Sequence, residues 1–222
     1  MKERLDNDTM ALRAAKELQD GDYVNLGFGI PTLSANFIPE GRSVTFQVES
    51  GALNVGGIAP AEVADHDLFN PGARPILPLP GLAFFDSADS FAMIRGGHLD
   101  VSIVGGFQVS EKGDLANWSR IQKGDRWMGI LGGAMEVTSA KKVIVVIEHI
   151  DKDGAPKIVK ECTLPLTRKG CVDLIITDVA VIEVTAEGLV LKEVAPGWTA
   201  EEVQAITEPK LLISPDLKEM EL

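Results

Sequence analysis

Cysteine and histidine are scarce in this 222-residue sequence, which contains two of the first and three of the second. Zinc and related sites need such ligands at short, regular spacings. No such spacing joins the five residues, which are Cys162, Cys171, His66, His98 and His149. We therefore expect no metal site. By number alone the two cysteines could pair as a disulfide, but reduced thiols are the favoured interpretation.

Long apolar runs are also absent. No stretch reaches the ~18 uninterrupted apolar residues that a membrane-spanning helix needs. The first ten residues, MKERLDNDTM, are polar where a secretory signal would be apolar. These absences predict a cytoplasmic chain without a membrane partner.

Basic residues are in the minority, because 21 lysines and arginines stand against 33 aspartates and glutamates, for a formal net charge of −12. A surface this acidic repels the phosphates of DNA and RNA, so we expect no nucleic-acid partner. One local positive patch could still hold an anionic cofactor. The sequence also lacks a Walker phosphate-binding loop and the nucleophile elbow of Ser–His–acid hydrolases.

Hydrophobic residues are abundant, at 45% of the chain, which is enough to build a large core. We expect one α/β domain over residues 1–222. Strand-like apolar runs occupy residues 23–29, 43–49, 99–109, 141–150 and 171–194, and helix-like segments occupy residues 7–22, 30–38, 87–97 and 198–207. Their alternation predicts an open, mostly parallel sheet flanked by helices, with ligand sites at the carboxyl ends of the strands.

Finer predictions concern the ends of these elements. The first helix should be capped by Asp8 or Thr9 and stopped by Gly21. Residues 60–82 should be irregular apart from one short strand near residues 75–79, and residues 113–135 should form a long functional loop. Thr199 and Glu202 should form a capping box at the start of the last helix.

Glu49 has an unusual setting, because it ends the apolar run FQV and precedes the small-residue turn SGALNVGG. An arbitrary glutamate is most often simply solvated. Here apolar neighbours can partly desolvate the carboxylate, and the small residues leave room for a substrate. Desolvation raises the pKa of a carboxylate and its nucleophilicity. The residues alone allow either a base or a nucleophile at this position.

Glycine pairs supply further candidates. Gly27 and Gly29 stand at a predicted helix start, where backbone N–H groups could hold an anion or an oxyanion. A purely structural turn is an equally good interpretation, since the third glycine of a dinucleotide fingerprint is missing. Gly132 and Gly133 precede a predicted strand, and without further context a tight turn is the simpler interpretation.

The segment MIRGGH, residues 93–98, is open to two interpretations. Arg95 could bind a phosphate or a carboxylate. It could equally be the basic residue of a helix C-cap, with Gly96 and Gly97 ending the helix. His98 is more often a satisfied turn residue than a catalytic one.

Several segments taken together resemble the beta subunit of the class I (3-oxoacid) CoA-transferases. The matching segments are VNLGFGIPT, Glu49 with Gly51, SFAMIRGGHLD, QVSEKGDLANW, GGAM and CTLPLT, which occur in the family's order over most of residues 20–170. The resemblance implies the family's open α/β fold, which ribose-phosphate isomerase-like proteins share. It also implies a homologous alpha subunit that supplies the rest of the cleft, in an α₂β₂ assembly.

The resemblance also implies roles for single residues. Glu49 would be the nucleophile, and the backbone N–H of Gly133 would lie in the oxyanion hole. Contacts with substrate or CoA are expected from Gly27, Gly29, Ser50, Gly51, Arg95, Gly96, Gly97 and Gly132. The expected reaction is ping-pong and passes through a glutamyl-CoA thioester. CoA and acyl-CoA are then substrates, and no permanently bound cofactor is needed.

The acid that the enzyme would use stays open. Ser50 stands where the acetoacetate and 3-oxoadipate groups of the family usually carry asparagine. A short 3-oxo acid such as acetoacetate is the leading expectation, and butyrate, 3-oxoadipate or a glutaconate-like acid are alternatives. The rival functions are a sugar-phosphate isomerase of the same fold group and a noncatalytic acyl-CoA-binding subunit.

Overall fold

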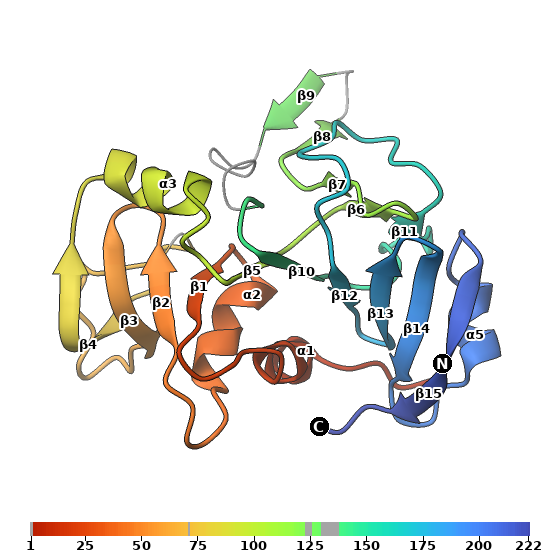
Figure 1. Ribbon diagram of the computed structural model, residues 1–222, viewed down its shortest axis with the longest axis horizontal. Coiled ribbons are helices and arrows are strands. Elements are labelled where there is room, and N and C mark those ends of the chain that lie inside the picture. The colour runs from red at the N-terminus through yellow and green to blue at the C-terminus, as the bar shows by residue number, and fades with distance from the viewer. Residues whose placement is uncertain (1, 71, 123–125, 130–137) are drawn as a thin grey trace.

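A ten-stranded sheet runs through the computed structural model, which describes residues 2–70, 72–122, 126–129 and 138–222. Five adjacent strands form its parallel centre, in the spatial order β2-β1-β5-β10-β12 (Figure 1). They are β1 (Tyr23–Leu26), β2 (Thr45–Val48), β5 (Val101–Val104), β10 (Lys142–Val146) and β12 (Leu174–Ile176). Because these strands point the same way, their carboxyl ends meet along one edge of the sheet.

Further strands extend this centre on both sides. They are β3 (Ala52–Ile58) and β4 (Ile76–Phe84) beyond β2, and β13 (Ala180–Thr185), β14 (Gly188–Val194) and β15 (Leu211–Glu219) beyond β12. All pair antiparallel except β15 with β14. Five of the nine pairings are therefore parallel, which confirms the predicted open, mostly parallel sheet.

Short strands outside the main sheet form two smaller sheets. The first contains β6 (Gln108–Ser110), β7 (Leu115–Ala116) and β11 (Ile158–Val159), and the second pairs β8 (Ser119–Gln122) with β9 (Arg126–Gly129). The described part of segment 113–135, predicted to be a long loop, therefore contains three strands. The predicted strand over residues 99–109 is divided at Gly105 and Gly106 between the main sheet and the first small sheet.

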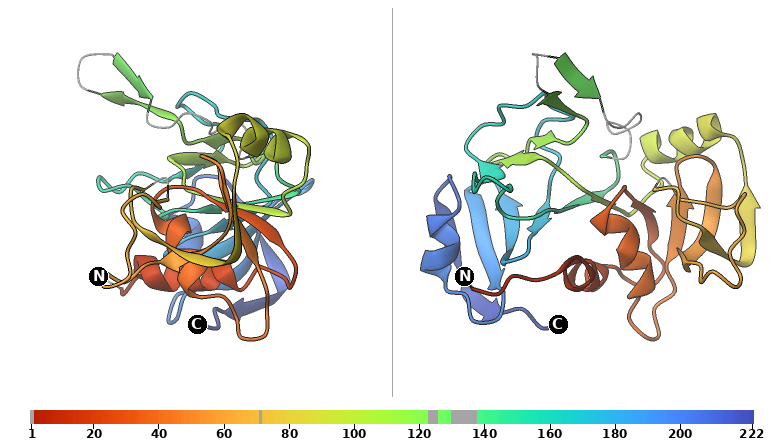
Figure 2. Two further views of the ribbon diagram at one scale, coloured as in Figure 1. Left: turned by 90° about the vertical axis from the view of Figure 1, so that its left-hand side faces the viewer. Right: turned by 180° about the vertical axis from the view of Figure 1, so that it is seen from behind.

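Helices cover the sheet on both faces and at one end. They are α1 (Asn7–Ala15), α2 (Ile30–Leu33), the 3-10 helix η1 (Ser34–Asn36), α3 (Ser87–Arg95) and α5 (Ala200–Ala205). Figures 1 and 2 show α3 lying across the end of the β2–β3 hairpin. None of the helices in the described part of the chain is both long and apolar enough to cross a bilayer.

Alternate residues of the central strands face two separate cores. Ile103 of β5 packs in the core that contains Met10 of α1, whereas Val104 packs in the core that contains Ile94 of α3. Burial on both faces explains why these strands are almost continuously apolar in sequence. A polar side chain inside such a strand is therefore an exception, and Asn25 of β1 is one.

The ends of α1 differ from the prediction. The N-cap is Asp6, whose Oδ1 accepts a hydrogen bond from the backbone N–H of Thr9 at 2.8 Å. The helix begins at Asn7, so Asp8 and Thr9 already lie inside its first turn, and Asp6, with its extended backbone, is the cap. The helix also ends at Ala15, well before Gly21. The capping box of Thr199 with Glu202 is confirmed.

Strands β3 and β4 form where the sequence pattern did not predict full strands. The segment ALNVGGI is strand β3 although it contains two glycines, and the proline-rich segment 76–84 is a full strand rather than a short one. β3 lies between β2 and β4, so pairing on both sides stabilises it. Gly56 also has a packing reason, because a Cβ there would lie 3.0 Å from the Cβ of Leu77.

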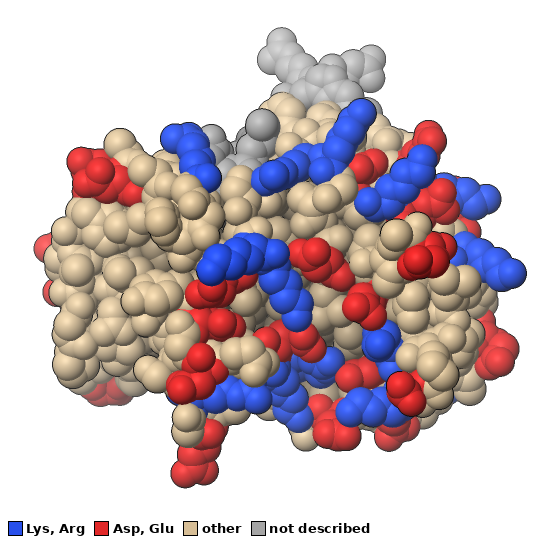
Figure 3. All heavy atoms as spheres, viewed as in Figure 1, with Lys and Arg blue, Asp and Glu red and all other residues tan. Residues whose placement is uncertain are grey.

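Edge strand β4 carries an uncharged surface. No charged residue occurs from Pro75 to Phe85, and most side chains of the strand are exposed, including Phe84 at 70%. Figure 3 shows that acidic and basic side chains mix over most of this face of the molecule, whereas the part over β2–β4 is mostly uncharged.

Candidate active site

Glu49 follows β2 directly, in the turn that leads into β3. The turn is closed by the backbone N–H of Gly51, which donates to the Val48 carbonyl at 2.9 Å. Gly51 has φ +120°, and a Cβ at this position would lie 2.0 Å from the Phe85 carbonyl oxygen. Only glycine fits there without moving the backbone. The sequence Glu-Ser-Gly thus places Glu49 at the carboxyl end of a parallel strand.

The Glu49 carboxyl group is partly removed from water. The residue is half-buried, and its Oε2 has no hydrogen-bond partner among the described residues. Burial raises the pKa of Glu49, while hydrogen bonds from its own backbone and from the Asn25 side chain act in the opposite direction. The predicted desolvation of this carboxylate is therefore present, and it makes Glu49 suited to act as a base or a nucleophile.

A layer of buried polar side chains lies beside Glu49. The Asn25 Nδ2 donates to the Oε1 of Gln47 at 2.8 Å and to its carbonyl at 3.2 Å. Asn25 is also aligned with Ser102 of β5, and neither the Asn25 Oδ1 nor the Ser102 Oγ has a partner in the described part of the chain. Buried polar atoms without partners are rare in proteins and costly. Their concentration around Glu49 makes this corner a candidate functional site.

The first glycine turn lies at the neighbouring strand end. Gly27 follows β1, and its N–H donates to the Ile103 carbonyl at 2.8 Å. A Cβ on Gly27 would approach the Val104 Cα to 3.2 Å, so close packing on β5 requires glycine. Gly29 has φ +90° and caps α2, which is only four residues long. Packing and backbone conformation therefore explain why both positions are glycine, and their contact with a substrate stays a prediction.

The other predicted residues lie in different places. Ser50 is exposed beside Glu49. Arg95 lies in the last turn of α3 with its guanidinium 5.6 Å from the Phe91 ring centroid, and Gly96 and Gly97 cap that helix. The Glu49 turn contacts an earlier part of α3, because the Ser90 hydroxyl, in the first half of the helix, donates to the Val48 carbonyl at 3.3 Å. The predicted contacts of Arg95, Gly96 and Gly97 with substrate or CoA stay predictions. Gly132 and Gly133 lie outside the described residues.

A groove runs along the carboxyl ends of β1, β5 and β10. Two cavities of about 160 and 570 Å³ share Gly106, Glu148 and Lys157 in their walls. The first also reaches Phe28, next to Gly27, and the second reaches Lys152. Sequence reasoning missed this groove. Its signal is the pair Gly105-Gly106, which ends β5 on the same edge of the sheet as Gly27 and Glu49.

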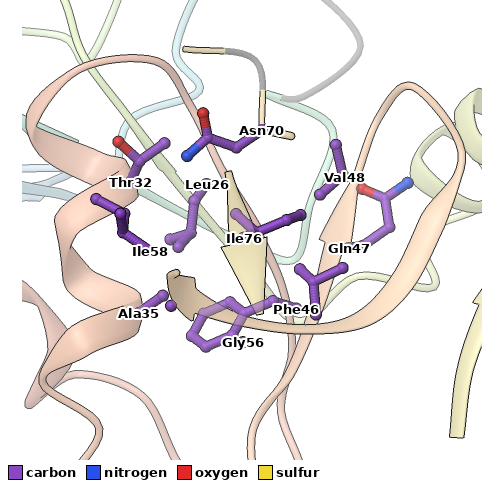
Figure 4. Close-up of a pocket in the computed structure, with 12 residues that line it drawn as sticks. Leu26, Thr32, Ala35, Phe46, Gln47, Val48, Gly56, Ile58, Asn70 and Ile76 are labelled. Atoms are coloured by element: carbon purple, nitrogen blue, oxygen red, sulfur yellow. The ribbon is translucent and has the colours of Figure 1, made fainter. Parts of the chain in front are cut away.

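A smaller apolar cavity lies between α2 and strands β2–β4 (Figure 4). Its volume is about 30 Å³, and it is lined mainly by core side chains such as Leu26, Phe46 and Ile76. Thr32 and Asn70 supply its polar groups. A cavity of this size holds about one water molecule, so it is no substrate site.

Other reactive groups in the structure do not compete with Glu49. Cys162 and Cys171 are free and half-buried, and burial raises the pKa of both thiols to about 11, which disfavours the reactive thiolate. Within the described residues, no three His, Cys, Asp or Glu side chains are grouped to hold a metal ion. Chemistry at this corner therefore centres on one carboxylate.

Comparison with known proteins gives a consistent answer. Residues 7–205 match the family described as Coenzyme A transferase. The chain is 50% identical over 197 residues to one of the subunits of the succinyl-CoA:3-ketoacid coenzyme A transferase of Helicobacter pylori, covering 88% of this chain and 93% of that one. It is 46% identical over 209 residues to the beta subunit of the acetate CoA-transferase of Escherichia coli, covering 94% of each chain.

Solved structures show the same fold. The apoenzyme of an acyl-CoA transferase from Escherichia coli O157:H7 matches with a TM-score of 0.76 at 23% identity. That match covers 98% of this chain but only 44% of the other, so this chain spans less than half the length of that protein. The family match covers most of the sequence, and the predicted family resemblance is confirmed. The chain belongs to the coenzyme A transferase family.

Proposed function

We propose that this chain is the glutamate-bearing beta subunit of a cytoplasmic CoA-transferase, which moves CoA between an acyl-CoA and a short-chain carboxylic acid. A 3-oxo acid such as acetoacetate is the proposed acid, because the Helicobacter relative is named for a 3-ketoacid. The Escherichia relative is named for acetate, another short carboxylic acid. The observation that carries the proposal is the desolvated Glu49 carboxylate in its glycine-closed turn.

The proposed reaction has two half-reactions. The Glu49 carboxylate attacks the thioester carbonyl carbon of the acyl-CoA, and the C–S bond breaks to give a mixed anhydride and the CoA thiolate. The thiolate attacks the Glu49 carbonyl carbon, so the first acid leaves as its carboxylate and a glutamyl-CoA thioester remains. A second acid then reverses these steps. Each covalent step replaces one acyl bond by another, so the thioester free energy is kept from water.

The burial of Glu49 favours this chemistry. Burial penalises the charged carboxylate but not a neutral anhydride or thioester, so the free energy of Glu49 falls relative to the carboxylate when either one forms. The proposed N–H of Gly133 would stabilise the oxyanion of the tetrahedral intermediate, and one such donor is typically worth ~10²–10³ in rate. Part of the long CoA tail would lie in the groove at the strand ends, near Lys152 and Lys157.

The proposed partner is a homologous alpha subunit, since both bacterial relatives are named as one subunit of a larger enzyme. The mostly uncharged surface over β3 and β4 adjoins the Glu49 turn, and it would not repel a partner subunit electrostatically. An alpha subunit docked there would complete the cleft around Glu49.

Mass spectrometry tests the proposal. The complex with its alpha subunit is mixed with acetoacetyl-CoA, quenched and digested, and the peptide that contains Glu49 should gain the mass of CoA less one water. Glu49→Gln should abolish both the mass gain and CoA exchange. The matched control is Glu40→Gln, which changes an exposed glutamate and should keep both. A CoA mass found only on other peptides would refute the role of Glu49, and binding without any mass gain would indicate a noncatalytic subunit.

A further inference from the structure

Helix α3 and the residue Phe85 just before it hold the turn that carries Glu49. The backbone N–H of Phe85 donates to the Gly51 carbonyl at 3.0 Å, on one side of the turn. On the other side, the Ser90 hydroxyl donates to the Val48 carbonyl at 3.3 Å. That same carbonyl also accepts from Gly51, so both of its lone pairs are used. The peptide that leads into Glu49 is therefore tied to α3.

Ser90 also fixes the side chain of Gln47. The Gln47 Nε2 donates to the Ser90 Oγ at 2.6 Å and to the Ser90 carbonyl at 3.3 Å. A backbone carbonyl only accepts, so the amide nitrogen of Gln47 must point to Ser90 and its Oε1 must point away. Ser90 is fully buried and Gln47 is 2% exposed, so water does not compete for these bonds.

The fixed Gln47 in turn orients Asn25. The Asn25 amide nitrogen donates to the Gln47 Oε1 and to the Gln47 carbonyl, which are both acceptors. Asn25 in turn acts on Glu49, because its side chain lowers the pKa of Glu49 and so favours the charged carboxylate. A chain of contacts thus runs from Ser90 through Gln47 and Asn25 to Glu49. Every member before Glu49 is buried.

We propose that Ser90 and Gln47 are positioning residues for the Glu49 nucleophile. This inference rests on the proposed function, and it gives the segment SFAMIRGG a role in addition to any contact with CoA. Ser90 holds both the backbone before Glu49 and, through Gln47, the amide beside its carboxylate. Attack by a carboxylate requires a fixed approach to the thioester carbon, and a displacement of ~1 Å can cost ~10²-fold in rate.

Steady-state and single-turnover kinetics of the two-subunit complex, with acetoacetyl-CoA as the donor, test the proposal. Ser90→Ala and Gln47→Met should each lower kcat by ~10–100-fold and slow the gain of CoA mass on the Glu49 peptide by the same factor. The KM for acetoacetyl-CoA should change less than ~threefold, because neither residue binds the CoA tail. Ser90→Cys keeps a weak hydrogen-bond donor and should recover part of the rate. It replaces Ser90→Ala as the test variant if Ser90→Ala does not fold.

A matched control separates positioning from general loss of packing. Ser34 is also a fully buried serine, and it lies in η1 rather than in α3. Ser34→Ala should leave kcat within ~twofold of the unmodified enzyme, whatever it does to the melting temperature. The double variant Ser90→Ala with Gln47→Met should lose at most ~threefold more than the worse single variant, since the two residues act as one unit.

The outcomes distinguish this inference from the proposed function. If the unmodified complex gains no CoA mass at Glu49, the proposed function fails first. If it gains the mass and Ser90→Ala does so at an unchanged rate, only the positioning role is overturned. Rate losses that multiply in the double variant, or a kcat loss of equal size in Ser34→Ala, would also overturn it.

Discussion

Glu49 shows how one side chain gains reactivity from its surroundings. Glu49 directly follows strand β2, whose last three residues are buried, and one of its carboxylate oxygens has no hydrogen-bond partner among the described residues. Fully solvated carboxylates are weak nucleophiles because water stabilises their charge. Burial removes part of that solvation from Glu49, and the Asn25 side chain partly compensates by favouring the charged form. The residue can therefore be both charged enough to attack and poorly enough solvated to react.

Gly51 gives the first prediction at the residue scale. Gly51→Ala should destabilise the protein by ~3 kcal/mol or more and abolish CoA exchange, because the new Cβ would lie 2.0 Å from the Phe85 oxygen at φ +120°. Urea unfolding and exchange assays measure both effects. The control is Gly41→Ala, at φ +81° with no atom within 4 Å, which should cost only ~1 kcal/mol and keep the activity. Equal costs at the two sites would contradict this account.

The residues around Glu49 differ in whether the sequence alone could predict their roles. Glu49 was predictable because an acid after an apolar run and before small residues is a local pattern. Gln47 and Ser90 were not predicted, since their hydrogen bond joins positions 43 residues apart. The only local signal was a polar residue inside an apolar run, as at Asn25 and Gln47. Such a residue must be satisfied by a partner that the linear sequence does not name.

At the scale of elements, a buried ion network joins α1 to the sheet. Arg13 of α1 donates to the two carboxylate oxygens of Glu193 in β14, at 2.7 and 3.0 Å, and to Glu17 at 2.9 Å. Lys142 of β10 donates to the second oxygen of Glu17 at 2.8 Å. This network lies apart from the Glu49 turn, so it contributes to stability rather than to catalysis.

Removal of Glu193 tests that separation. Glu193→Ala should lower the free energy of unfolding by ~3–5 kcal/mol, because it leaves the Arg13 guanidinium buried without its bidentate partner. Exchange activity per folded molecule should stay unchanged. Glu221→Ala, which breaks the exposed pair with Lys218, should cost less than ~1 kcal/mol. Urea titrations at neutral pH measure both, and a small loss for Glu193→Ala would contradict the prediction.

The elements were predicted unevenly, and for physical reasons. The buried parallel strands and the capping box of α5 carry signals within their own residues, and both are confirmed. β3 and β4 form because each pairs with a neighbouring strand, which outweighs the poor strand propensity of glycine and proline. β15 likewise pairs with β14 although the two are separated by α5 in the sequence. Contacts of this kind are not visible in a local pattern.

At the scale of the whole molecule, acid should weaken the fold through His149. This histidine is fully buried, with its ring nitrogens 3.0 Å from the Thr177 hydroxyl and 2.7 Å from the Thr207 hydroxyl. Burial lowers the pKa of His149 from 6.5 to about 4, against the opposing charge of Asp178. The unfolded chain therefore binds a proton between these values that the folded protein does not.

The sign of the effect follows from that difference. Stability from neutral His149 is present above pH ~6.5 and is lost as the pH falls towards ~4, by up to ~3 kcal/mol in total. Urea unfolding at pH 7, 5.5 and 4.5 measures the loss. A His149→Gln variant should show a smaller decline over this range, whereas His98→Gln, which changes an exposed histidine, should decline like the unmodified protein. An identical decline in all three proteins would exclude His149 as the cause.

The composition of edge strand β4 has one more consequence. A sheet edge can recruit a foreign strand when it offers a regular row of N–H donors and carbonyl acceptors, and this is how fibrils start. Pro78 and Pro80 remove two of those donors within β4. The largest sheet of this molecule can therefore present an uncharged flank to a cognate surface without becoming a template for its own polymerisation.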